Sequence, residues 1–220
     1  MGAPEHKVWL PLGGEPILIR TLRRLAHCQA IAGLVVVVAP EDRERLLELE
    51  EAYDLPNIAG IIDGGATRQE SVTRGFEAIA GSPDLVLVHD GARPLVNPSQ
   101  VDQVIRAAAR HGAAILAVPI HDTIKRVAGD VVVESPPRAE FWAAQTPQVF
   151  RYALLEEALR RAREDGYEGT DEASLVERLG HQVHIVPGSR RNLKITTPDD
   201  LAMAEGLLAA SRPEMVADPL

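Results

Sequence analysis

The sequence predicts an α/β fold in which a Rossmann-like, mostly parallel, twisted sheet carries helices on both faces. Apolar runs rich in β-branched residues recur along the chain, which is typical of strands buried on both faces. Segments with helical charge spacing separate these runs, as in repeated β–α units. The length of 220 residues suits one well-cored domain. We therefore expect a single domain at 1–210 and a frayed tail at 211–220.

The first half of the chain alternates strands and helices in the order that a parallel sheet requires. Leu34–Ala39 reads LVVVVA and is the clearest buried strand, while Asp63-Gly64-Gly65 forms the turn into a later helix. Ligands bind such sheets at the carboxyl ends of strands, where Asp90 and Arg93 are expected. The expected strands of this half are 34–39, 58–62, 84–89 and 113–118, and the expected helices are 41–53, 68–79 and 98–111.

A β-hairpin interrupts this rhythm in the middle of the chain. Two strand-like pieces, 121–127 and 130–134, are separated by Ala128-Gly129, and Pro136-Pro137 ends the second piece. Because a lone hairpin is marginal in water, we expect this arm at about 121–140 to pack against a second subunit. The elements expected after the arm are helices at 152–163 and from about 170, strands at 183–186 and 192–196, and a helix from Pro198 with Thr197 as its N-cap.

Composition excludes several classes of partner. The net charge of −9 argues against binding to a nucleic-acid backbone. No apolar run approaches the roughly 18 to 20 residues that a membrane span needs, and the first residues lack the apolar core of a signal peptide. The single cysteine, Cys28, cannot form an intrachain disulfide, which fits a reducing compartment. We therefore expect a cytoplasmic protein without a nucleic-acid or membrane partner.

The pair Asp90 and Arg93 is the first candidate site. An aspartate at the end of an apolar strand can hold Mg²⁺, which often binds through one or two carboxylates and substrate phosphates. The guanidinium of Arg93, three residues later, suits the geometry of a phosphate. The spacing alone also allows a helix cap with a surface ion pair.

A glycine-containing turn and the helix that follows it form a second candidate site. Gly64 and Gly65 allow a ligand to approach the backbone closely, and Arg68 and Ser71 lie near a helix start that favours anions. An ordinary tight turn before a helix is the alternative.

Only three of the 23 basic residues are lysines, namely Lys7, Lys125 and Lys194. Lys194 lies between apolar residues in NLKIT, so it either reaches water along its stem or faces a buried anion. Thr170 is expected to cap a helix whose first turn contains Asp171 and Glu172.

In order along the chain, these features resemble the 2-C-methyl-D-erythritol 4-phosphate cytidylyltransferases of the non-mevalonate isoprenoid pathway. The resemblance runs from about Gly2 to about Leu208. It implies a nucleotidyltransferase that uses Mg²⁺ to join CTP to a sugar-alcohol phosphate, giving CDP-methylerythritol and pyrophosphate. The motifs that carry it are LPLGGEPIL, DGGATRQES, LVHDGARP, DTIKR, AAQTPQ, TDEAS and NLKITTPDDL.

The resemblance also implies roles for residues around the phosphates and the base. Asp90 matches the magnesium-holding aspartate, and Arg93 matches an arginine that helps to bind the acceptor. Lys194 matches a lysine that contacts the reacting phosphates, and Lys7 one that stabilises the transition state. The positions that it implies for nucleotide binding are Gly64, Gly65, Arg68 and Ser71.

Acceptor binding is implied for four further residues. Thr146 and Thr170 match positions near the methylerythritol phosphate. Thr123 and Arg138 match residues of an arm that reaches the substrate in the partner subunit, so the resemblance implies a homodimer joined through the arm.

One departure from the family concerns the start of the sequence. The family begins with an apolar strand and a glycine-rich loop of the form PAAGxGxRMG, and Met1-Gly2 aligns with the end of that loop. The first strand and the loop are thus expected to be missing. Either the start codon is assigned too late, or the chain is a fragment with impaired CTP turnover.

Two other functions stay open from the sequence. Ribitol-5-phosphate cytidylyltransferase shares most of the motifs and should differ around the acceptor pocket. A non-catalytic, dimeric nucleotide-binding remnant would also explain a missing loop. The presence of Asp90, Arg93, Lys194 and Lys7 favours an enzyme over the remnant.

Overall fold

The computed structural model describes residues 6–55 and 57–210 of the chain. These residues fold into two compact units. The described part of unit 1 lies within Met1–Ser82, His89–Asp102 and Arg191–Leu220, and unit 2 comprises Pro83–Val88 and Gln103–Arg190. The expected start of the family resemblance near Gly2 and the expected frayed tail at 211–220 lie outside the described residues.

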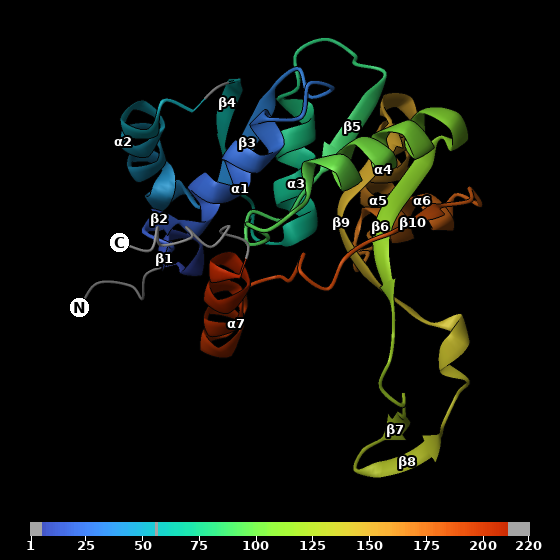
Figure 1. Ribbon diagram of the computed structural model, residues 1–220. Helices are drawn as coiled ribbons and strands as arrows, with labels where there is room; N and C mark the ends of the chain where they lie inside the picture. Colours follow the sequence, from blue (N-terminus) through green and yellow to red (C-terminus); the bar gives the residue numbers. More distant parts are fainter. Residues whose placement is uncertain (1–5, 56, 211–220) are drawn as a thin grey trace, which may run out of the picture. The chain divides into compact units, whose positions relative to one another are not determined.

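Unit 1 contains a parallel pair of strands, β3 (Leu34–Val38) and β4 (Ile58–Asp63), shown in Figure 1. The helix α2 (Arg43–Tyr53) connects them, and α3 (Arg68–Glu77) follows β4. A short 3-10 turn, η2 (Pro40–Asp42), precedes α2. This part of the chain confirms the predicted alternation of strands and helices, including the parallel pairing that a helical crossover produces.

The helix α1 (Ile17–Ala26) of unit 1 was not predicted from the sequence. Its buried face includes Leu18, Leu22 and Leu25, whose spacing is that of an amphipathic helix. Three short elements precede it, and all lie in unit 1. They are η1 (Lys7–Trp9), β1 (Pro11–Leu12) and β2 (Glu15–Pro16).

The last helix, α7 (Pro198–Ala209), begins as the sequence predicted. The side chain of Thr197 accepts a hydrogen bond from the Asp200 backbone, and Pro198 occupies the first turn. Ala204 of α7 packs with Leu12, Ile17 and Ile195 in a buried apolar cluster of unit 1. Residues from the beginning and from the end of the described chain thus pack together in this cluster, with Ile17 of α1 among them.

The predicted strand at 192–196 is wrong. This segment forms no strand, although the Ile195 N–H donates to the Ala92 carbonyl at 2.9 Å. A strand needs repeated backbone hydrogen bonds to a neighbouring strand, and a single bond to a turn does not provide them. Ile195 is 1% exposed despite this.

Unit 2 is built on a four-stranded sheet in the order β10-β6-β9-β5. Strands β5, β6 and β10 share one direction, and β9 runs against them. The sequence did not predict β9, because Pro147 lies within it and proline is rare inside strands. The register shifts between Ile115 and Ala117 of the neighbouring strand, which accommodates the proline. The bounds are β5 (Leu85–Val88), β6 (Ala113–Pro119), β9 (Trp142–Arg151) and β10 (His184–Pro187).

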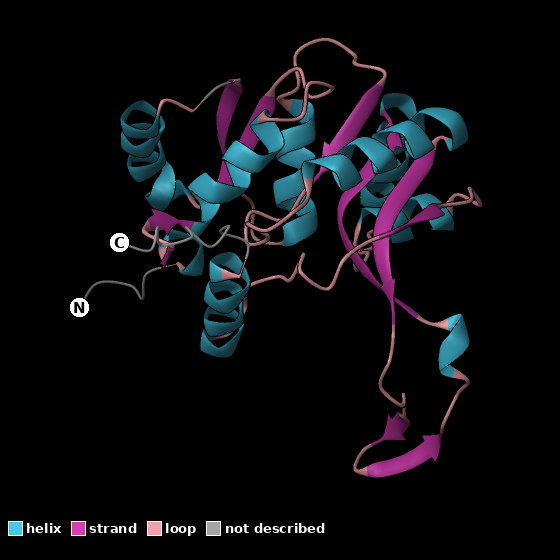
Figure 2. Ribbon diagram, viewed as in Figure 1, coloured by secondary structure: helices cyan, strands magenta, loops and turns pink. Residues whose placement is uncertain are grey.

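Helices cover both faces of this sheet, which confirms the predicted α/β class. Figure 2 shows α4 (Pro98–His111) on one side and α5 (Tyr152–Glu164) with α6 (Glu172–Arg178) on the other. Five consecutive residues of β6 are buried, as expected for a strand covered twice. Among the described residues, no helix is both long and apolar enough to span a bilayer.

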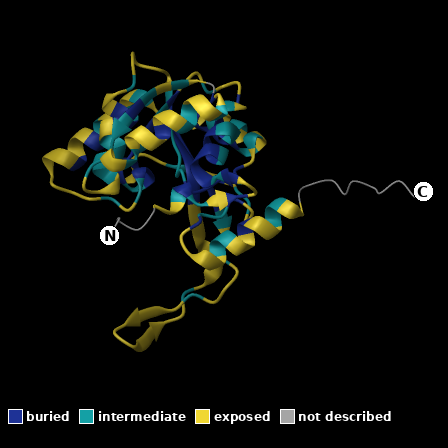
Figure 3. Cartoon of the chain, turned by 90° about the vertical axis from the view of Figure 1, so that its left-hand side faces the viewer, coloured by how far each residue is buried: buried dark blue, intermediate teal, exposed yellow. Residues whose placement is uncertain are grey.

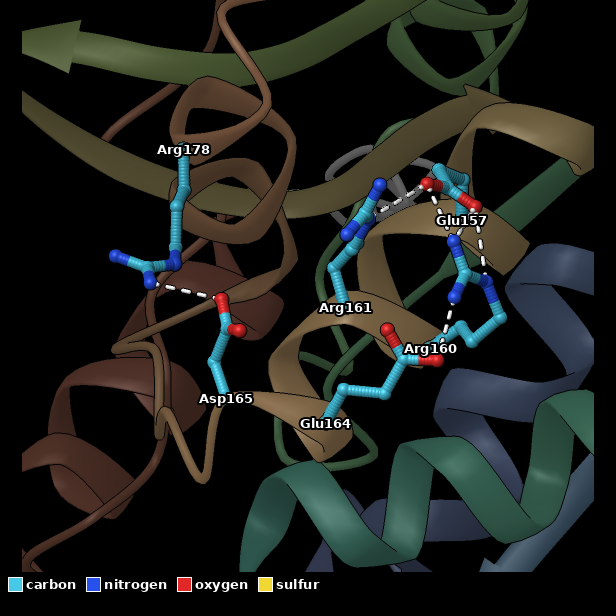
Figure 4. A network of polar contacts seen from close by, with 6 residues as sticks. All are labelled: Glu157, Arg160, Arg161, Glu164, Asp165 and Arg178. Carbon is cyan, nitrogen blue, oxygen red and sulfur yellow. Dashed lines mark hydrogen bonds and ion pairs between the residues drawn. The ribbon is translucent and has the colours of Figure 1, made fainter.

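The outer surface of α5 carries a network of ion pairs, shown in Figure 4. Arg160 binds both Glu157 and Glu164, and Arg161 also binds Glu157. Arg178 of α6 reaches Asp165 at the end of α5. These side chains are about half exposed, so we expect the network to contribute little to stability.

The predicted hairpin arm is present, with shorter strands than the sequence suggested. β7 (Arg126–Ala128) pairs with β8 (Val131–Glu134) around a turn in which Gly129 has a φ of 58°. Every residue of the two strands is exposed, as Figure 3 shows by colour. Within unit 2 the hairpin therefore lacks an apolar surface to pack against.

Candidate active site

A single carboxylate surrounded by three cations marks the candidate site in unit 1. Lys194 Nζ lies 3.2 Å from Asp90 Oδ2, and Arg93 Nε lies 3.3 Å from the same oxygen. Arg68 Nη2 lies 3.7 Å from Asp90 Oδ1. The cluster joins the turn after β5, the start of α3 and the segment before α7, so the fold brings together four of the predicted site residues.

The cluster is electrostatically unbalanced. Burial raises the pKa of Asp90, but the charges of Lys194, Arg68 and Arg93 outweigh burial and hold that pKa below its ordinary value. Asp90 is therefore ionised at neutral pH. One negative and three positive charges leave two positive charges in excess, which favours an anionic ligand.

Arg93 is not part of a simple surface ion pair, because its side chain is buried and makes a second hydrogen bond besides its contact with Asp90. Its side chain is 11% exposed, and Nη1 donates to the Asn192 carbonyl oxygen at 2.7 Å. Asn192 is fully buried, and sequence reasoning missed it because the bond spans 99 positions. Burial lowers the pKa of the adjacent His89 to about 4, so this imidazole is neutral at neutral pH and adds no charge to the cluster.

A second feature of unit 1 is a pocket of about 370 Å³. It lies where the parallel strands β3 and β4 end, the edge at which α/β sheets bind ligands. This volume falls within the range of small-molecule sites. Its lining residues are Val37, Val38, Ala39, Pro40, Glu41, Gly64, Gly65 and Ser71.

Close packing surrounds the two glycines of this pocket, most tightly at Gly65. A Cβ on Gly65 would lie 2.4 Å from the side chain of Glu70, and a Cβ on Gly64 would lie 3.1 Å from Ser71 Oγ. Ser71 Oγ accepts a hydrogen bond from the Gly65 N–H at 3.0 Å and donates to the Thr67 carbonyl at 2.9 Å. The turn at 63–67 is thus tied to the first turn of α3.

Arg74 also supports this turn, although the sequence did not single it out. Its Nη1 donates to the Gly64 carbonyl at 2.8 Å, and its Nη2 pairs with Glu70. Glu70 in turn accepts from the Ala66 N–H at 2.8 Å. The i, i+4 spacing of Glu70 and Arg74 was the available signal.

Lys7 lies in unit 1 at the start of η1, with an exposed side chain. The preceding residue, His6, pairs with Asp42, and this hydrogen bond raises the pKa of His6. This pairing holds the residue before Lys7 against η2, which contains the pocket-lining residue Glu41. The Lys7 carbonyl accepts a hydrogen bond from the Leu10 N–H, and the Lys7 side chain makes no hydrogen bond or ion pair with the described residues.

The remaining predicted residues belong to unit 2. Thr123 and Arg138 are exposed in the arm, where Arg138 Nη1 donates to the His121 carbonyl at 2.6 Å. Thr146 is buried in β9. Thr170 is exposed just before α6.

Thr170 is not the cap of α6, contrary to expectation. Asp171 is the N-cap, and it forms a reciprocal capping box with Ser174. The buried Gln148 completes this corner, because its Nε2 donates to Asp171 Oδ2 and its Oε1 accepts from the Ala173 N–H. The Thr170 side chain is thereby left available for other partners.

Comparison with known proteins gives a consistent result. The family model described as IspD, 2-C-methyl-D-erythritol 4-phosphate cytidylyltransferase, matches residues 1–210. A cytidylyltransferase of that name from Geobacillus kaustophilus is 44% identical over 214 residues, covering 97% of this chain and 93% of the relative. The corresponding protein from Symbiobacterium thermophilum is 45% identical over 209 residues, covering 94% of this chain and 87% of the relative.

Solved structures agree with these relatives. The 4-diphosphocytidyl-2C-methyl-D-erythritol synthase from Anaerococcus prevotii superposes with a TM-score of 0.84 at 30% identity, covering 90% of this chain and 88% of its own. The 2-C-methyl-D-erythritol 4-phosphate cytidylyltransferase from Thermus thermophilus gives a TM-score of 0.77 at 39% identity, covering 92% and 93%.

Proposed function

This chain belongs to the 2-C-methyl-D-erythritol 4-phosphate cytidylyltransferase family, and from this premise we propose that the Asp90 cluster of unit 1 is where its reaction takes place. The reaction is the transfer of a cytidylyl group from CTP to 2-C-methyl-D-erythritol 4-phosphate, with release of pyrophosphate. The excess of two positive charges around Asp90 is the observation that carries the assignment. The family match spans both units, so we further propose that they act as one nucleotidyltransferase domain.

The chemistry needs charge neutralisation more than a protein nucleophile. An oxygen of the acceptor phosphate attacks the α-phosphorus of CTP, and the bond from that phosphorus to the oxygen bridging to the β-phosphorus breaks. Negative charge then spreads over the α-phosphate oxygens and the leaving pyrophosphate. Lys194 and Lys7 would stabilise this charge, and Arg93 would hold the acceptor phosphate through its guanidinium.

We propose that Asp90 would hold Mg²⁺ at this site. The low pKa of Asp90 keeps it in the ionised form that a metal ligand requires. Within residues 6–55 and 57–210, no group of three or more His, Cys, Asp and Glu side chains could hold a metal ion. Asp90 would therefore share Mg²⁺ with phosphate oxygens, as is common for this ion. When bound, Mg²⁺ would neutralise part of the triphosphate charge.

The pocket at the ends of β3 and β4 would hold the cytosine base. The Gly65 N–H and the Ser71 O–H already have partners, whereas the carbonyl oxygens of Gly64 and Gly65 and the Ser71 hydroxyl oxygen could accept hydrogen bonds from the amino group of a cytosine. Arg68 lies at the start of the same helix and reaches Asp90. Helix α3 would thus contribute both to the base pocket, through Ser71, and to the Asp90 cluster, through Arg68.

Gly65→Ala is expected to raise the KM for CTP by about tenfold with little change in kcat, because the added methyl group displaces Glu70 and the turn that lines the pocket. Steady-state rates at varied CTP would measure this effect. Gly206→Ala is the matched control, since a Cβ there meets nothing within 4 Å. An unchanged KM in Gly65→Ala would remove this pocket from nucleotide binding.

We propose that the arm joins two copies of the chain. Its exposed valines, Val127, Val131, Val132 and Val133, are an apolar surface that water does not favour and that a second copy could bury. In such a homodimer, Thr123 and Arg138 would reach the acceptor bound by the partner subunit, while Thr146 and Thr170 would serve the acceptor within their own subunit.

Val132→Asp is expected to convert the dimer to a monomer at micromolar concentration, because the charge would be buried without a partner. Light scattering coupled to size exclusion would report the mass. Leu47→Asp is a control of similar exposure on α2, at 48% compared with 53% for Val132. If Val132→Asp stays dimeric, the arm is not the principal contact.

We also place the protein in the cytoplasm, where CTP is available. Its single cysteine supports this location. Cys28 is buried, and burial raises the pKa of its thiol to about 11, so the thiol stays protonated and unreactive at neutral pH.

Pyrophosphate release from CTP, measured with methylerythritol phosphate and with ribitol 5-phosphate, tests the proposed function. We expect faster release with methylerythritol phosphate. Equal or faster release with ribitol 5-phosphate would reassign the acceptor, and no release with either would support the non-catalytic alternative.

A further inference from the structure

The turn that carries Asp90 and Arg93 rests directly on α1. Thr21 of α1 is 1% exposed, and its Oγ1 lies 2.8 Å from the Gly91 carbonyl oxygen and 3.0 Å from the Ile17 carbonyl oxygen. The Ile17 carbonyl belongs to the same helix, whereas the Gly91 carbonyl belongs to a segment 70 positions away. The hydroxyl has one proton and donates to one of these oxygens at a time, and the Gly91 carbonyl is the nearer acceptor, so this donation ties α1 to the turn.

A second residue of α1, Leu18, also lies against the turn at Gly91. A Cβ on Gly91 would lie 2.9 Å from Leu18 Cδ1, so the Leu18 side chain lies close to the turn and would have to shift to admit a side chain at Gly91. Leu18 and Thr21 are three residues apart and share one face of α1. One contact is apolar and the other is a hydrogen bond, and together they define the position of Gly91.

The opposite side of the turn is held by the segment before α7. The Ile195 N–H donates to the Ala92 carbonyl at 2.9 Å, and Arg93 Nη1 donates to the Asn192 carbonyl at 2.7 Å. The turn itself closes through the Arg93 N–H and the Asp90 carbonyl, at 3.1 Å. The four residues from Asp90 to Arg93 are thus clamped between α1 and the segment that bears Lys194.

We infer that Thr21 is a positioning residue for cytidylyl transfer, which fixes the turn from Asp90 to Arg93 against Lys194. This inference rests on the proposed function. Thr21 is buried in α1 and would act on the site through the Gly91 carbonyl. Asp90 precedes Gly91, so a shift of this carbonyl moves the carboxylate relative to Lys194 Nζ, which lies 3.2 Å from it. Small misplacements of reacting groups lower rates strongly.

Thr21→Val keeps the shape of the side chain and removes the hydroxyl, leaving the Gly91 carbonyl without this buried donor. We expect kcat to fall by about tenfold to a hundredfold, and the KM for CTP to stay within about threefold. Thr21→Ser keeps the hydroxyl and should restore most of kcat. Thr73→Val is the matched control, because the Thr73 hydroxyl donates within α3 to the Gln69 carbonyl.

Hydrogen exchange gives a readout that does not depend on turnover. In Thr21→Val, the amides of Arg93 and Ile195 should exchange about tenfold faster than in the wild type, because both close the clamp. Thr73→Val should leave these two amides unchanged. Thr21→Ala provides the same comparison if the valine variant does not fold.

The two proposals can fail separately. A wild-type protein that releases no pyrophosphate would sink the proposed function, while exchange at Arg93 and Ile195 would still report on the clamp. The positioning role of Thr21 is overturned if its hydroxyl-free variants show wild-type exchange at both amides. It is equally overturned if Thr21→Ser loses as much kcat as Thr21→Val.

Discussion

Asp90→Asn is expected to lower kcat with CTP and methylerythritol phosphate by about a thousandfold. The substitution keeps the shape of the side chain but removes the negative charge that three cations surround. It also removes the carboxylate proposed to hold Mg²⁺. We expect the fold to persist, because Arg93 keeps its hydrogen bond to the Asn192 carbonyl.

The measurement for this variant is steady-state pyrophosphate release over a range of Mg²⁺ concentrations, with circular dichroism to monitor the fold. Asp165→Asn is the matched control, since Asp165 also pairs with an arginine but on the exposed surface of unit 2. Near-normal turnover in a folded Asp90→Asn protein would exclude Asp90 from both the metal site and the chemistry.

Lys194→Met is expected to lower kcat/KM by about a hundredfold to a thousandfold. The change removes the cation closest to Asp90, at 3.2 Å, and reduces the positive excess of the cluster from two charges to one. Less charge then remains to stabilise the α-phosphate oxygens as pyrophosphate leaves. Lys194→Arg restores the charge without the compact ammonium group, so we expect partial recovery.

Rates at varied CTP and varied acceptor would separate binding from chemistry for Lys194→Met. Arg178→Met removes a cation of similar side-chain exposure, 46% compared with 39% for Lys194, from an ion pair outside unit 1, and it should leave both parameters unchanged. If Lys194→Met raised only the KM for the acceptor, Lys194 would be a binding residue and not a group that stabilises the transition state.

The sequence predicts those parts of this fold whose local patterns agree with their environment. The buried run at Leu34–Val38 and the capped start of α7 are of this kind. The strand β9 was missed because Pro147 is locally unfavourable, and only its partners β6 and β5 make the strand stable. For the segment at 192–196 the sequence predicted a strand that is not formed: its apolar pattern resembles a strand, but none of the strands among residues 6–55 and 57–210 pairs with it.

The residues of the candidate site also fall into those that the sequence indicated and those that it did not. Asp90, Arg93 and Lys194 were found because charged groups next to apolar runs are conspicuous in a sequence. Thr21 and Asn192 were not, since each acts through a backbone carbonyl contact with a residue 70 or 99 positions away. Such contacts leave no spacing pattern, and only the folded chain reveals them.

Phosphorus-31 NMR of the protein with CTP, Mg²⁺ and methylerythritol phosphate is the most direct test of the central claim that the Asp90 cluster carries cytidylyl transfer. The wild type is predicted to produce signals of a new diphosphate diester and of pyrophosphate in equal amounts, and Asp90→Asn is predicted to produce neither over the same period. Equal product formation by the two proteins, or product only when ribitol 5-phosphate is the acceptor, would contradict this account.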